Sequence, residues 1–174
     1  WTFPIVVSMH DPKVLYVAGS QLFKSTNEGQ SFTKISPMLA RNDPRTLGPS
    51  GGPITRDQTG VETYGTIFAL AESPPKAGLL WAGSDDGRVH VSQDGGARWT
   101  DVTKAVPGFP EWGTVSMIEA SPFDASTAYL VVDNHRMDDM RPYLWKTTDL
   151  GKSWKSLAGG LPADVYLHAV REDP

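Results

Sequence analysis

The stretch Thr147-Thr148-Asp149-Leu150-Gly151-Lys152-Ser153-Trp154 has two earlier counterparts in the chain, at 25–32 and 92–99. An Asp or Asn side chain can accept hydrogen bonds from backbone N–H groups just ahead of it in a turn. Glycine supplies a positive φ, and the aromatic residue carries apolar area into the next strand. Each stretch, here called a turn box, therefore predicts a turn between two strands. The shared positions are Ser25, Asn27, Gly29, Phe32; Ser92, Asp94, Gly96, Trp99; and Thr147, Asp149, Gly151, Trp154.

The sequence around each turn box repeats in a fixed order. An apolar run ends at a proline, a second run follows, a third enters the turn box and a fourth leaves it. Four short strands repeated roughly every fifty residues are typical of β-propeller blades. We therefore predict an all-β fold, a propeller segment of four-stranded antiparallel blades. The predicted parts are blade 1 at 3–36, an insertion at 37–64, blade 2 at 65–103, blade 3 at 113–158 and the first strand of a fourth blade at 164–172.

The turn box resembles the Asp-box, or BNR repeat, with the pattern Ser/Thr-x-Asp-x-Gly-x-x-Trp. The copies at 92–99 and 147–154 match it fully, and the first copy differs by Asn27 and Phe32. Asp-box proteins are propellers that include sialidases, xyloglucan-degrading hydrolases and sortilins, and the chain is similar to sortilin-like and "glycosyl hydrolase BNR repeat" bacterial proteins. The resemblance implies a structural role for the box and an extracellular or periplasmic location. It leaves activity open, because the family mixes hydrolases with binding scaffolds.

The charge and composition of the chain exclude several classes of partner and site. The chain has 174 residues, a net charge of −4 and no cysteine, so it carries no basic footprint for nucleic acid and no disulfide or thiolate site. No apolar run is long enough to span a bilayer. Three blades and one strand do not close a ring, since propellers have about four to eight blades. We therefore expect the remaining blades, or self-association, to complete the ring.

Strand alternation separates the loops into two faces. The turn boxes share a face with the loops that follow each first strand. The insertion at 37–64 and a second one at 133–142 lie on the opposite face, together with the turn at Asp85 and Asp86. Loops of this length inside a compact fold are usually functional or disordered. We therefore expect a ligand to bind opposite the turn boxes.

The elaborated face carries aromatic and charged residues that suit a glycan or a protein. Ring faces stack on sugars, and arginine forks make paired hydrogen bonds. The aromatic residues just before each first strand could equally be wedges packed between blades. The predicted ligand-binding residues are Tyr64, Trp112, Arg41, Arg56, His135 and Arg136.

Two functions remain open from the sequence. The favoured one is a non-catalytic scaffold that binds a glycan or protein ligand on the elaborated face. The alternative is a glycoside hydrolase, which requires two carboxyl groups about 5–9 Å apart. No cofactor is predicted, and the four histidines show no metal spacing. The candidate catalytic carboxylates are Glu62, Glu111, Asp85, Asp86 and Asp138.

Overall fold

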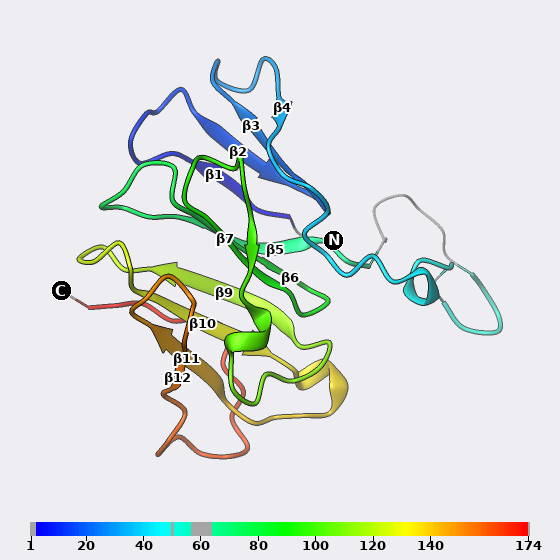
Figure 1. Cartoon of the computed structure of the whole chain (residues 1–174). Helices are drawn as coiled ribbons and strands as arrows, with labels where there is room; N and C mark the ends of the chain where they lie inside the picture. The colour runs from blue at the N-terminus through cyan, green and yellow to red at the C-terminus, as the bar shows by residue number, and fades with distance from the viewer. Residues whose placement is uncertain (1–2, 50, 57–63, 174) are drawn as a thin grey trace.

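The computed structural model describes residues 3–49, 51–56 and 64–173. It contains three four-stranded antiparallel sheets, and each pairs its strands in sequence order (Figure 1). This confirms the all-β fold and the three four-stranded units. The strands are β1 (Ile5–Val7), β2 (Leu15–Ala18), β3 (Leu22–Ser25) and β4 (Thr33–Lys34) in blade 1; β5 (Ile67–Glu72), β6 (Leu80–Ser84), β7 (Val89–Ser92) and β8 (Thr100–Asp101) in blade 2; β9 (Thr114–Ala120), β10 (Ala128–Asp133), β11 (Tyr143–Thr147) and β12 (Lys155–Ser156) in blade 3.

The blades pack face to face through apolar side chains. Blades 2 and 3 share one core, in which the buried rings of Trp81 and Trp154 meet edge to face with centroids 6.0 Å apart. A Cβ on Gly83 of β6 would lie 2.7 Å from the Cβ of Val115 on β9. Only glycine therefore allows the two blades to approach this closely.

The three turn boxes adopt the same hydrogen-bonded geometry. In the third box the Thr147 hydroxyl accepts from the N–H of Gly151 at 3.0 Å, and Asp149 accepts from the N–H of Ser153 at 2.9 Å. Gly151 has a φ of 82°. The indole of Trp154 donates to the carbonyl of Gly151 at 3.1 Å, which closes the turn. The equivalent Ser–Gly and Asp/Asn contacts are present in the boxes at 25–32 and 92–99.

The aromatic residue of the box is not equally buried in every blade. Trp154 is 7% exposed, whereas Phe32 in blade 1 is 45% exposed. The tryptophan of the second box is intermediate, and it reaches across to blade 1 by donating from Nε1 to the carbonyl of Ile35 at 3.0 Å. The indole nitrogen therefore adds a contact between blades that a phenyl ring cannot make.

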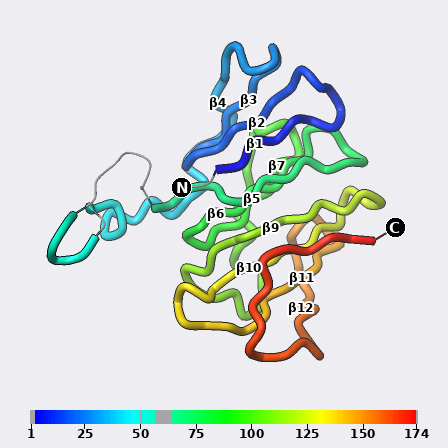
Figure 2. Tube along the Cα trace, turned by 180° about the vertical axis from the view of Figure 1, so that it is seen from behind, coloured from blue at the N-terminus to red at the C-terminus, as the bar shows by residue number. Residues whose placement is uncertain are grey.

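Residues 164–172, expected to be the first strand of a fourth blade, are not paired as a strand in the described structure. The segment runs along blade 3 without strand pairing, as the red tube beside β9 and β10 shows (Figure 2). The first strand of a blade obtains its ladder from the second strand of the same blade, and the described residues contain no such partner for this segment. Side chains hold the segment instead: Arg171 contacts Glu119 at 2.9 Å and Tyr129 donates to Glu172 at 2.8 Å.

The loops divide between two faces of the blades. The turn boxes contact the loops that follow the first strands, through hydrogen bonds from Glu28 to Lys13, from Gly95 to Gly78 and from Leu150 to Ser126. The insertion with the short helix η1 (Pro44–Thr46) and the helix η3 (His135–Met137) lie on the other side, at the right of the view (Figure 1). A further short helix, η2 (Thr103–Ala105), follows β8. Among the described residues there is no helix long and apolar enough to cross a membrane.

Candidate functional site

The face opposite the turn boxes contains a cavity of about 730 Å³. Its walls come from the end of the insertion, the turn between β6 and β7, the connection before β9, the loop with η3, and the segment at 164–172. Polar residues outnumber apolar ones in the lining, but most of the surface exposed to the cavity belongs to apolar atoms. The lining residues are Thr46, Tyr64, Thr66, Phe68, Asp85, Trp112, Thr114, Asp133, Asn134, His135, Arg136, Met137, Tyr166 and His168.

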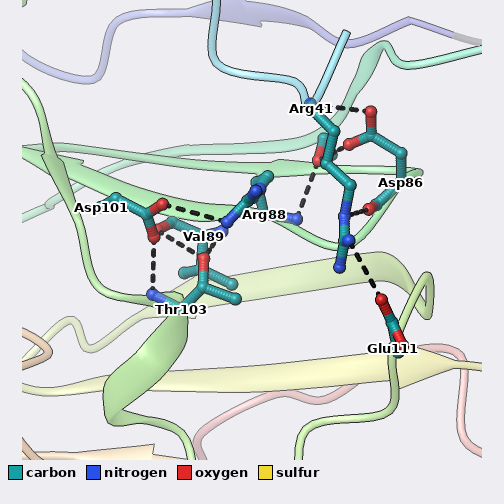
Figure 3. Close-up of polar contacts among 8 residues, drawn as sticks. Arg41, Asp86, Arg88, Val89, Asp101, Thr103 and Glu111 are labelled. Atoms are coloured by element: carbon teal, nitrogen blue, oxygen red, sulfur yellow. Dashed lines mark hydrogen bonds and ion pairs between the residues drawn. The ribbon is translucent and has the colours of Figure 1, made fainter. Parts of the chain in front are cut away.

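One wall is a stack of three side chains, two from the connection between β4 and β5 and one from the connection between β8 and β9. The rings of Tyr64 and Trp112 stack with centroids 6.2 Å apart, and the Arg41 guanidinium lies 4.3 Å from the Trp112 ring centroid. Trp112 has a φ of 64°, a left-handed conformation that costs energy for a bulky residue. Arg41 also donates from Nε to the carbonyl of Asp86 at 2.7 Å and pairs with Glu111 at 3.5 Å (Figure 3). Arg41 thus holds Trp112 in its strained position.

The acidic pair in the turn between β6 and β7 anchors the same wall. Asp85 accepts from the N–H groups of Gly65 and Thr66 at 3.1 and 2.8 Å, and from the Thr66 hydroxyl at 3.2 Å. Asp86 accepts from the N–H of Arg41 at 2.8 Å. Burial raises the pKa of the Asp85 carboxyl above its usual range, and the hydrogen bonds from Thr66 oppose this shift. Burial beside Asp85 also raises the pKa of Tyr64 to about 12.

The opposite wall is built on Asp133, at the end of β10. One of its oxygens contacts Nδ1 of His135, and the other lies 3.0 Å from Nδ1 of His168. The His135 ring stacks on Tyr166 with centroids 4.5 Å apart. Burial would raise the pKa of the Asp133 carboxyl, but the hydrogen bonds from His135 and His168 outweigh it and hold that pKa below its usual range. This wall therefore joins blade 3 to the segment at 164–172.

The loop at 133–142 is ordered by a second carboxylate. Asp139 accepts from Asn134, from Tyr143 at 2.7 Å and from the Arg141 guanidinium at 2.8 Å. The hydrogen bonds from Arg141 are the largest influence on the Asp139 carboxyl and hold its pKa below the usual range. Arg141 and Asp139 thus act as local partners that shape the loop next to the cavity.

The structure brings together some of the candidate residues and separates others. Of the predicted ligand-binding residues, Tyr64, Trp112, His135 and Arg136 line the cavity, Arg41 supports it from behind, and Arg56 is exposed elsewhere. Of the candidate carboxylates, Asp85 lines the cavity and Asp86 is buried behind it, while Glu111 and Asp138 are exposed. Glu62 lies outside the described residues. The described part of the chain holds no group of three or more side chains suited to a metal ion.

Sequence reasoning did not select Tyr166, His168 or Asn134 as binding residues. The first two were assigned to a strand, and Asn134 stood among many polar loop residues. The alternation of Tyr166 and His168 along an expected first strand was a usable signal, because alternate residues of a first strand face the centre of a propeller. The contact of His168 with Asp133 spans 35 positions in the chain, which spacing alone does not predict.

Replacing Arg41 with alanine should lower the free energy of unfolding by about 1–2 kcal/mol, because a partly desolvated cation–π contact and a hydrogen bond are lost. Arg41→Lys keeps the charge but cannot keep the Nε hydrogen bond and planar stacking together, so it should recover only part of the loss. Urea unfolding of both variants measures the effect. Equal stability of Arg41→Ala and the parent chain would show that the stack does not hold Trp112.

Two curated proteins are similar to part of this chain. Vacuolar protein sorting/targeting protein 10 of Penicillium rubens is 42% identical over 67 residues, which are 38% of this chain and 4% of that protein. The protein of the same name from Laccaria bicolor is 34% identical over 83 residues, which are 48% of this chain and 5% of that protein. The chain thus matches only a small fraction of these relatives. No family model matches it.

Solved structures with a similar fold cover most of the chain. An ancestral GH74 enzyme superposes with a TM-score of 0.61 at 18% identity, covering 88% of this chain and 17% of that one. The GH74 xyloglucanase from Xanthomonas campestris gives 0.57 at 21% identity, covering 92% and 24%. YCF48 bound to D1 peptide gives 0.52 at 15% identity, covering 84% and 37%. These likenesses and the three blades define the fold as a β-propeller segment.

Proposed function

We propose that this chain is part of a recognition scaffold that binds a glycan or protein ligand, without turnover, in the cavity opposite the turn boxes. The observation that carries the proposal is the cavity itself. It exposes aromatic surface, while its two carboxylates already accept hydrogen bonds from other groups of the protein. Asp85 holds backbone N–H groups, and Asp133 holds two imidazoles. These hydrogen bonds use lone pairs of both carboxylates and leave fewer of them for a reacting substrate. Such a site suits binding better than catalysis.

One observation favours the alternative, a glycoside hydrolase. The pKa values of Asp85 and Asp133 move in opposite directions within one cavity. A raised and a lowered carboxyl pKa are what an acid and its partner need in glycoside cleavage. The hydrolase hypothesis therefore centres on Asp85 and Asp133 rather than on Glu111, Asp86 or Asp138.

A paired assay separates the two functions. Oligosaccharides and peptides are tested for binding by calorimetry, and the oligosaccharides are tested for cleavage by product analysis. The scaffold hypothesis expects binding that weakens in Tyr64→Ala, with no cleavage by the parent chain. Cleavage that disappears in Asp85→Asn, with binding retained, would replace the scaffold by the hydrolase. Absence of binding by every ligand tested would contradict both.

The relatives support two further parts of the proposal. The similarity to vacuolar sorting proteins supports a sortilin-like role in the secretory pathway or outside the cell, and the peptide-bound YCF48 supports a protein ligand. The shared hydrogen bonds of the three turn boxes support their assignment as Asp-boxes. The location is tested by expressing the chain within its surrounding protein in a eukaryotic cell and following where the protein goes. Retention in the cytosol would contradict a location in the secretory pathway or outside the cell.

We also propose that blade 1 docks on a further blade or on a second copy. Ile5 on β1 is 61% exposed, whereas its counterparts at the start of the other blades, Ile67 and Val115, are fully buried. These counterparts are buried because each packs on the preceding blade. The isolated chain should therefore self-associate, and Ile5→Glu with Val7→Glu should reduce the association. Light scattering tests this, and a monodisperse, heat-stable parent monomer would contradict it.

A further inference from the structure

The histidine pair at the cavity has a fixed pattern of hydrogen bonding. Nδ1 of both His135 and His168 contacts a carboxylate oxygen of Asp133. An ionised carboxylate only accepts, so each Nδ1 carries the hydrogen. In the neutral ring Nε2 is then a hydrogen-bond acceptor, and it lies on the edge of the ring away from Asp133. Neither Nε2 has a hydrogen-bond partner among the described residues, and both rings line the cavity.

Asn134 lines the same wall. Its side-chain nitrogen donates to Asp139 at 3.0 Å, which fixes the oxygen on the other side of the amide. Asn134 is 7% exposed, and its oxygen is buried without a hydrogen-bond partner in the described structure. That oxygen is shielded from solvent, so the acceptors of this wall that a ligand can reach are the Nε2 atoms of the partly exposed His135 and the exposed His168.

The rest of the cavity is also electron-rich. The rings of Tyr64 and Tyr166 line it, and the faces of aromatic rings carry partial negative charge. Asp85 and Asp133 lie in the wall, and the charge of Asp133 strengthens Nε2 as an acceptor by polarising each imidazole. Arg136 is the one Lys or Arg in the described lining, and its exposed side chain can extend into solvent.

We infer that the cavity binds its ligand through an ammonium group, as found on a lysine side chain or a free polyamine. The ammonium donates to the imidazoles of His135 and His168, and an aromatic face covers it by a cation–π contact. A carboxylate ligand would face acceptors instead of donors. A neutral sugar hydroxyl would lack the cation–π attraction that a charged ammonium makes with the ring faces. This inference rests on the proposed recognition function, for which it names the ligand class.

Four probes at pH 7.5 test the inference on the full chain, with binding followed by ligand-observed NMR titration. They are Nα-acetyl-lysine amide, its Nε-acetylated form, spermidine and a neutral glucose oligosaccharide. Acetylation removes the charge and should weaken binding at least about tenfold, the equivalent of one charged hydrogen bond. Tighter binding of spermidine than of the lysine amide identifies a free polyamine as the source, and the reverse identifies a protein.

Matched variants assign the effect to the histidines. His168→Leu should weaken lysine-amide binding about tenfold, and His168→Gln should restore part of it, because glutamine again offers an acceptor. His10→Leu is the control, because His10 contacts the carbonyl of Ser73 on the turn-box side.

Each outcome bears on the inference. Equal binding of the lysine amide and its Nε-acetylated form would overturn it, as would a loss in His10→Leu that equals the loss in His168→Leu. Binding of the oligosaccharide in a Tyr64-dependent manner, without binding of either amine, would overturn the ammonium assignment and leave the recognition function standing. If none of the four probes binds, the ammonium assignment is overturned as well. The recognition function is then tested separately by the calorimetric assay with oligosaccharides and peptides.

Discussion

Trp81→Ala should lower the free energy of unfolding by about 3–5 kcal/mol, the usual cost of removing a buried indole from a core. Trp81 is fully buried between blades 2 and 3 and meets Trp154 edge to face. A truncated side chain would leave a cavity at the centre of the shared core. The blades are already in close contact at Gly83, so they cannot move closer together there to fill it. Urea unfolding followed by circular dichroism measures the loss.

Trp81→Phe is the matched control for this prediction. The indole N–H of Trp81 has no hydrogen-bond partner in the described structure, so phenylalanine removes an unpaired donor along with part of the ring. Its loss should be less than half that of the alanine variant, because most of the apolar contact remains. A loss below about 1 kcal/mol for Trp81→Ala would contradict a single core shared by both blades.

Asp86→Ala should lower the free energy of unfolding by about 2–3 kcal/mol. Asp86 is 1% exposed and accepts from the N–H of Arg41 (Figure 3). It also accepts from the hydroxyl of Ser84. Removing a buried charged acceptor breaks two strong hydrogen bonds and leaves their donors without a partner. The insertion should also become easier to cleave, and limited proteolysis measures this beside chemical unfolding.

Asp43→Ala is the control in the same insertion. Asp43 pairs with Arg45 at 2.6 Å, but the Arg45 side chain is 82% exposed. Exposed ion pairs contribute little to stability, so this variant should unfold close to the parent. If Asp43→Ala and Asp86→Ala have equal effects, Asp86 does not anchor the insertion to blade 2.

The blades were predictable because each of their signals is local. The hydroxyl, the acidic or amide residue and the glycine of a turn box act within one turn, so their spacing encodes the geometry that Thr147, Asp149 and Gly151 adopt. The segment at 164–172 shows the limit of local reasoning. Its residues have the pattern of a strand, but a strand also needs a partner, and pattern says nothing about whether a partner is present.

The site was predictable only in part. The length of two loops pointed to the face that holds the cavity, and Tyr64 and Trp112, which line it, were selected by their repeated position before a first strand. The contacts of Asp133 with His168 and of Arg41 with Trp112 join residues far apart in the chain. These contacts depend on how the blades and their connections are arranged in space, which the spacing of residues in the sequence does not encode. The exposure of Arg56 likewise follows from where the insertion folds, not from its composition.

The central claim is that ligand binds opposite the turn boxes, and one comparison of variants tests it most directly. With any ligand found in the screen, affinity is measured for Tyr64→Ala on the cavity face and for Lys152→Ala in the third turn box. The account predicts at least about a tenfold weaker affinity for Tyr64→Ala, because a stacking ring is lost, and no change for Lys152→Ala. Weaker binding in Lys152→Ala with parent-like binding in Tyr64→Ala would contradict it.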